Sequence, residues 1–126
     1  MVKKILFIVV LIVALQLVIA AETQIKVKTL ADHRISIIIR QTGQMVTAES
    51  FHKDTGSGEF TVTSTVSSAE IDMLITLKKD GENIITRNYE VIKTGGELFL
   101  NFMPGEDKLQ TAEERAAETA LATKTN

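Results

Sequence analysis

Two histidines are the residues of this sequence best suited to metal or acid–base chemistry. His33 directly follows Asp32, and His52 lies two positions before Asp54. Imidazole nitrogens and carboxylate oxygens are common metal ligands, so His33, His52 and Asp54 are candidate metal ligands if their loops meet in space. The alternative is that all of them are solvated turn residues, because their spacing matches no ligand motif.

The same region offers the one arrangement that resembles a nucleophilic triad. Ser50 or Ser57 would be the nucleophile, with His52 and Asp54 as its partners. No Gly-x-Ser-x-Gly elbow accompanies them, and the glycines of the following loop match neither a calcium loop nor a phosphate-binding loop. We therefore predict no catalytic residues and no cofactor, and the protein is not expected to be an enzyme.

A row of hydroxyl groups is the second candidate site, this time for binding. Thr61, Thr63 and Thr65 alternate with apolar residues such as Val62 and therefore share one face of an extended chain. A flat hydroxyl face could bind a glycan or a partner strand. The alternative is the ordinary solvated face of a β-strand, because threonine is a good strand former.

Alternating apolar residues indicate that strands position all of these side chains. Asp80-Gly81 separates two such runs and predicts a β-hairpin. Turn signals recur about every 8–12 residues without helices between them, which is typical of an all-β protein. We predict one antiparallel β-sandwich of about seven strands, because parallel pairing would require crossover helices. The expected strands are residues 24–30, 34–41, 45–51, 59–66, 71–78, 83–91 and 97–103.

The inward-facing positions of these strands form the predicted core. They are Ile25, Val27, Ile35, Ile37, Ile39, Phe60, Val62, Ile71, Met73, Ile75, Leu77, Leu98, Leu100 and Phe102. Without any cysteine, the domain must be stabilised by burying these side chains rather than by disulfides.

Both ends of the chain differ from the domain at 22–105. Residues 1–21 combine two lysines, a short apolar run and a small-residue exit, which predicts a secretory signal peptide or, if it is not cleaved, an anchor.

Residues 106–126 are rich in Ala, Glu and Thr. Thr111 and Glu114 have capping-box spacing and favour a helix from 112 to about 121. No apolar stripe is present to dock it, so we expect a disordered or weakly helical tail.

Two stretches resemble known sandwich domains. Residues 50–62, Ser-Phe-His-Lys-Asp-Thr-Gly-Ser-Gly-Glu-Phe-Thr-Val, are similar to a hairpin of transthyretin-like and carboxypeptidase-regulatory-like domains. Residues 71–85, with their Lys-Asp-Gly turn, resemble the next hairpin of those domains and of many immunoglobulin-like modules. The usual Gly-x-Pro-x-x-Gly-Val opening is replaced by Leu-Ala-Asp-His-Arg-Ile at 30–35. The resemblance implies a non-catalytic module that binds, spaces or stabilises.

We therefore expect a non-catalytic binding or adhesion module, secreted or in the cell envelope, whose partner is a protein or another cell-surface component such as a glycan. After signal cleavage, 12 basic residues face 16 acidic ones, and this balance provides no field for nucleic acid. A membrane would be contacted only through an uncleaved signal segment. The alternatives are a self-assembling surface subunit that pairs edge strands, and a small metal-dependent enzyme centred on His33 and His52.

Overall fold

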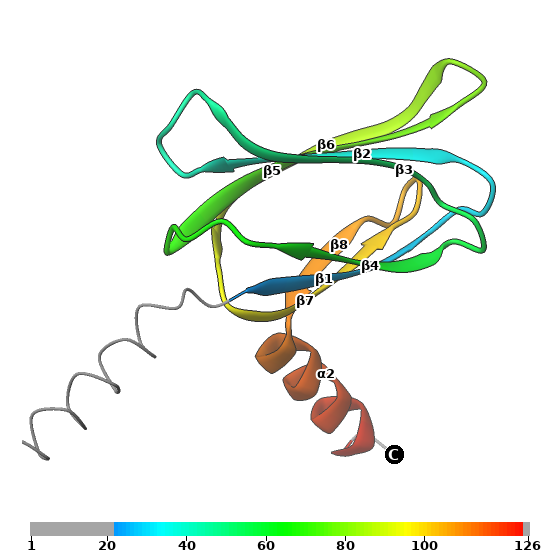
Figure 1. Cartoon of the computed structure of the whole chain (residues 1–126). Coiled ribbons are helices and arrows are strands. Elements are labelled where there is room, and N and C mark those ends of the chain that lie inside the picture. Colours follow the sequence, from blue (N-terminus) through cyan, green and yellow to red (C-terminus); the bar gives the residue numbers. More distant parts are fainter. Residues whose placement is uncertain (1–21, 125–126) are drawn as a thin grey trace, which may run out of the picture.

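In the part of the chain that the structure describes, β-strands form two layers, and one helix follows them at the C-terminal end (Figure 1). A computed structural model describes residues 22–124, with side chains to Leu121, so the predicted signal peptide lies outside the described residues. The strands are β1 (Thr23–Thr29), β2 (Arg34–Gln41), β3 (Thr47–Asp54), β4 (Glu59–Ser64), β5 (Glu70–Lys79), β6 (Glu82–Lys93), β7 (Gly96–Phe102) and β8 (Lys108–Thr111), and the helix is α2 (Ala112–Lys124).

The strands form two four-stranded sheets. The first sheet has the order β4-β1-β7-β8, and the second sheet has the order β3-β2-β5-β6. The all-β sandwich is thus confirmed, and the hairpin at Asp80-Gly81 joins β5 to β6. One pair, β1 with β7, is parallel. It needs no crossover helix, because the chain between these two strands builds the whole second sheet and β4.

The core lies between the two sheets, as alternation predicts. Thirteen of the fourteen expected core side chains are buried, together with Val66, Ile85 and Ile92. Phe60 is the exception, since it is only partly buried and packs at the margin of the core. Its strand, β4, is an edge strand, and the Nζ atom of Lys53 covers its ring at 4.3 Å from the centroid.

The C-terminal segment contributes more to the sandwich than expected. The predicted domain ended at residue 105, but Lys108–Thr111 pairs with β7 as an eighth strand. This strand is only four residues long, too short to show clear alternation in the sequence. The capping box beyond it is present, because the Glu114 amide donates to Thr111 Oγ1 at 3.1 Å and α2 begins at Ala112.

The loop that carries the family resemblance is fixed by backbone geometry. Thr55 is buried, donates its hydroxyl to the Leu30 carbonyl at 2.7 Å and accepts the His33 amide at 2.9 Å. Gly58 has φ +96° and lies so close to the Thr29 carbonyl oxygen that a Cβ atom would collide with it. Thr55 and Gly58 therefore hold the β1–β2 turn against the β3–β4 loop. This structural role explains why threonine and glycine occupy these two positions.

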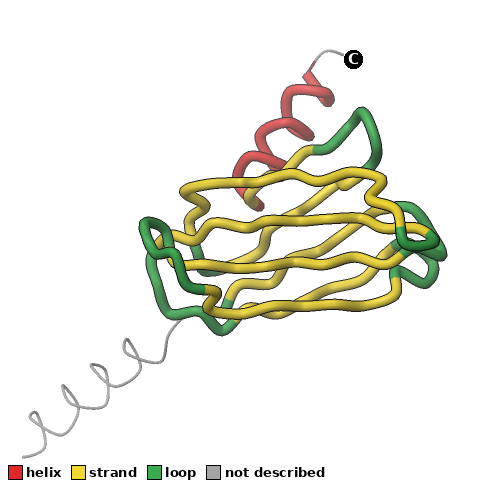
Figure 2. The backbone as a smooth tube through the Cα atoms, turned by 90° about the horizontal axis from the view of Figure 1, so that it is seen from above, coloured by secondary structure: helices red, strands yellow, loops and turns green. Residues whose placement is uncertain are grey.

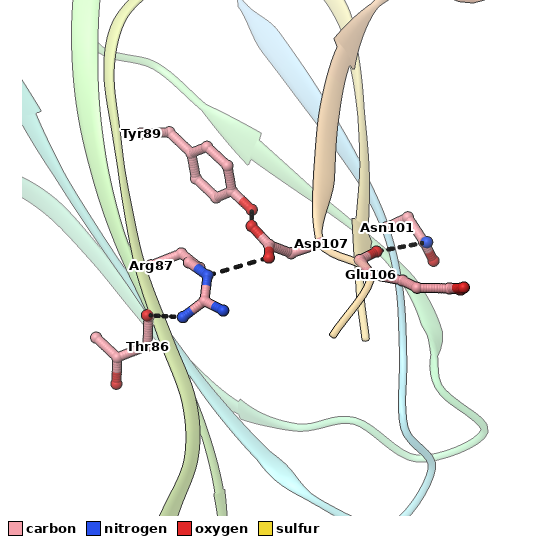
Figure 3. A network of polar contacts seen from close by, with 6 residues as sticks. All are labelled: Thr86, Arg87, Tyr89, Asn101, Glu106 and Asp107. Atoms are coloured by element: carbon pink, nitrogen blue, oxygen red, sulfur yellow. Dashed lines mark hydrogen bonds and ion pairs between the residues drawn. The ribbon is translucent and has the colours of Figure 1, made fainter. Parts of the chain in front are cut away.

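A polar clasp closes the edge of the sandwich between β6 and β8 (Figure 3). Tyr89 donates its hydroxyl to Asp107 Oδ2 at 2.7 Å, and Arg87 Nε donates to Oδ1 at 3.0 Å. The hydrogen bond from Tyr89 holds the pKa of Asp107 below its usual value, whereas burial, followed by this bond, raises the pKa of Tyr89. Asn101 fixes the same turn by donating to the Glu106 carbonyl at 3.1 Å.

Candidate functional site

The three candidate metal ligands do not come together. His33 lies in the β1–β2 turn, where its Nδ1 is 2.7 Å from the Ala31 carbonyl oxygen. His52 lies on the outer face of the second sheet, and Asp54 on that face forms an ion pair with Arg34 at 3.5 Å. Within residues 22–124 no group of three His, Cys, Asp or Glu side chains could hold a metal ion.

The possible triad is not assembled either. Ser50, His52 and Asp54 alternate along β3, so successive members are about 6.6 Å apart along the strand. No hydrogen bond in the described part of the chain joins His52 to Ser50 or to Asp54, and Ser57 lies in the exposed β3–β4 loop. This arrangement offers no activated nucleophile.

The threonine row divides between two environments. Thr61 and Thr63 are exposed on the outer face of the first sheet, opposite Lys26 and Gln24 of β1. Thr65 follows the end of β4, and its hydroxyl donates to Glu49 Oε2 at 3.1 Å. Thr65 therefore ties the first sheet to β3, and only Thr61 and Thr63 remain on an open surface.

The outer face of the first sheet carries chemically distinctive side chains in two transverse rows. The strand register places Lys26 between Thr61 and Phe99, with Gln110 beyond Phe99. The next row is Glu59, Lys28, Asn101 and Lys108 in the same strand order. Because side chains on one face of adjacent strands lie about 5 Å apart, each row forms a continuous band of side chains across the sheet, and all of them except Phe99 are polar.

Helix α2 leaves β8 and forms one wall beside these rows, below the first sheet in Figure 1. The Arg115 guanidinium lies 4.3 Å from the centroid of the Phe99 ring. Glu118 accepts a hydrogen bond from Lys108 Nζ at 3.0 Å and another from the Gln110 amide. Figure 2 shows that α2 then projects away from the sandwich, so its later turns do not lie along the sheet.

Together the two rows and α2 enclose an open groove of about 1000 Å³, here called the α2 groove. Its charged lining residues are Lys26, Lys28, Lys108, Arg115, Glu59 and Glu118. Four of these six are basic, so the groove is net positive in a chain whose formal net charge is −2.

The charges of the α2 groove are only partly neutralised. Lys26 forms an ion pair with Glu97 at 3.4 Å, and Lys108 with Glu118 at 3.0 Å. The hydrogen bond from Lys108 keeps the pKa of Glu118 below its usual value. Lys28 lies in the second row, and no residue among 22–121 forms an ion pair with it. An anionic ligand would therefore find the Lys28 ammonium beside hydroxyl and amide donors.

Of the sequence candidates, the α2 groove contains only Thr61. The alternation in β1 predicts that Lys26 and Lys28 lie on a solvent-exposed face, but no sequence signal placed these lysines beside Phe99 and Arg115. The spacing of Arg115 and Glu118, three apart on one helix face, was the available clue.

Within residues 22–124 no helix is long and apolar enough to cross a bilayer. The chain matches no protein-family model, and comparisons with curated proteins and with solved structures found no match.

Proposed function

We propose that this chain is a secreted, non-catalytic β-sandwich module of immunoglobulin- or transthyretin-like type that binds a protein or cell-surface component through the α2 groove. The observation that carries the proposal is the convergence of Lys26, Lys28 and Lys108 in one groove of a mildly acidic chain. A concentration of lysines on one face attracts an anionic partner.

The alternatives have less support. The candidate metal ligands and the serine–histidine pairs are spread along β3 and the β1–β2 turn, whereas the groove side chains converge. Self-assembly by edge pairing would use an edge strand, which is β3 or β6 in the second sheet and β4 or β8 in the first. At Val91 β6 carries a bulge with a positive φ, and bulges are one way in which sheets blunt their edges.

A charge reversal in the groove tests the proposal. The full chain and its Lys28→Glu variant would each be used to capture partners from the native cell envelope. Lys78→Glu is the matched control, because Lys78 is also an exposed lysine without an ion pair but belongs to β5 of the second sheet. We expect Lys28→Glu alone to lose the partner; equal capture by all three proteins would refute a role for the groove.

A further inference from the structure

We propose that α2 is a displaceable occupant of the α2 groove, and that the groove's ligand is an acidic polypeptide segment that places a carboxylate where Glu118 now lies. This inference rests on the proposed binding function and adds the ligand class and the means of access. It depends on three observations: how weakly α2 is held, what Glu118 contacts, and which ligand chemistry the remaining side chains fit.

Helix α2 contacts the sandwich through exposed side chains. Every side chain from Ala112 to Leu121 is exposed, so docking buries no apolar anchor. Arg115 contacts the first sheet at Phe99, and Glu118 contacts it at Lys108. The Lys108–Glu118 pair is more than half exposed on both sides, and such surface pairs contribute little to stability. A helix of thirteen residues is also marginal by itself in water. The free energy needed to displace α2 from the sandwich is therefore small.

Glu118 shows how a polypeptide carboxylate fits this surface. It reaches the first sheet from outside, accepts from Lys108 and Gln110, and leaves Lys28 of the same row unpaired. When Glu118 departs, three lysines and two glutamates, Glu59 and Glu97, remain on this face of the sheet, so the surface stays net positive. A segment with two or more carboxylates could pair with Lys28 and Lys108 together, which α2 does not do.

The aromatic content favours a polypeptide over a glycan. Sugar recognition relies on exposed aromatic faces, whereas Phe99 is half-buried with Arg115 over its ring. The chain has no tryptophan, and its single tyrosine, Tyr89, belongs to the clasp at the edge of the sandwich. Carboxylate-to-lysine pairing and amide hydrogen bonds are what the groove offers, and both suit an acidic peptide.

Titration of the full chain with labelled poly-L-glutamate at low salt tests the ligand class. Lys28→Ala should weaken binding about five-fold, from the loss of one exposed charge pair, and Lys78→Ala should leave it unchanged. Glu118→Gln should tighten binding about two- to five-fold, because Lys108 is freed. Equal affinities for all four proteins, no binding at all, or tighter binding of a sulfated polysaccharide than of poly-L-glutamate would overturn the inference.

Hydrogen exchange on the same complex tests displacement. We expect the amides of α2 to exchange faster when poly-L-glutamate is bound, while those of β1 and β7 do not. Slower exchange in α2 would show that the helix stays as a wall of the groove and would refute displacement. If poly-L-glutamate fails to bind but capture of the native partner still depends on Lys28, the ligand class is wrong and the proposed function survives.

Discussion

Replacing Tyr89 by phenylalanine should measure how much the β6–β8 clasp stabilises the sandwich. The substitution keeps the ring against the core and removes only the hydroxyl that donates to Asp107 at 2.7 Å. Hydrogen bonds to charged groups contribute about 1.5–3 kcal/mol. Asp107 retains Arg87 and is 19% exposed, so the lower part of that range applies, about 1.5–2 kcal/mol. For a domain of this size the melting temperature should fall by about 5–15 °C.

The pH dependence of this loss has a definite sign. The lowered pKa of Asp107 means that folding favours the charged form of its carboxyl group. The stability that this group contributes is therefore fully present above the ordinary carboxyl pKa. It is lost as the pH falls through the pKa of Asp107 in the folded protein. The difference in stability between the parent and Tyr89→Phe should therefore shrink in acid. The raised pKa of Tyr89 acts at the other end, because the unfolded tyrosine ionises first and the parent loses stability above pH of about 10.

Two measurements suffice for this prediction. Thermal unfolding followed by circular dichroism gives the stability of the parent, Tyr89→Phe and the control Arg87→Gln, which removes the more exposed partner and should cost less than about 1 kcal/mol. Because Tyr89 is the only tyrosine and there is no tryptophan, near-ultraviolet absorbance titrates this one group. A Tyr89→Phe protein as stable as the parent, with a parent tyrosine that ionises at its ordinary pKa, would refute the clasp.

Three further substitutions test the fold. Ile75→Asp puts a charge in the centre of the core and should abolish the cooperative melt, whereas Thr63→Asp on the outer face should not. Gly58→Ala should cost more than about 2 kcal/mol by denaturant unfolding, because its Cβ meets the Thr29 carbonyl. Gly56 also has a positive φ, +55°, but open space around it, so Gly56→Ala should cost only about 1 kcal/mol; equal losses would contradict the close approach. Val91→Asn should stabilise the folded protein by about 0.5–1 kcal/mol in the same assay, since the exposed valine has φ +54° and asparagine tolerates that region better. A loss of stability would count against backbone strain at the bulge.

The parts of the fold that were predictable are those encoded by neighbouring residues. Ile35, Ile37 and Ile39 alternate without interruption, and each of them is buried. Asp80-Gly81 specifies its turn because both residues take positive φ there, at 50° and 81°. Alternation and turn chemistry act over a few residues, so they can be read directly from the sequence.

The candidate site depends on pairings between distant segments, which the sequence does not reveal. The α2 groove exists because β1 lies between β4 and β7, and this order brings Lys28 beside Asn101. Likewise, Asp107 lies in a turn without any periodic pattern, and only the packing of β6 against β8 makes it the acceptor for Tyr89. The short strand β8 was missed for the same reason, since its partner β7 defines it.

Site-specific cross-linking from the outer face of the first sheet tests the binding role of the α2 groove most directly. A photoreactive residue would replace Thr61, which lines the groove, or Thr86, which is exposed on β6 of the second sheet, in the full chain expressed in its native cells. We predict a defined adduct from position 61 that disappears with Lys28→Glu, and none from position 86. An adduct from position 86 alone, or one from position 61 that survives Lys28→Glu, would contradict the account.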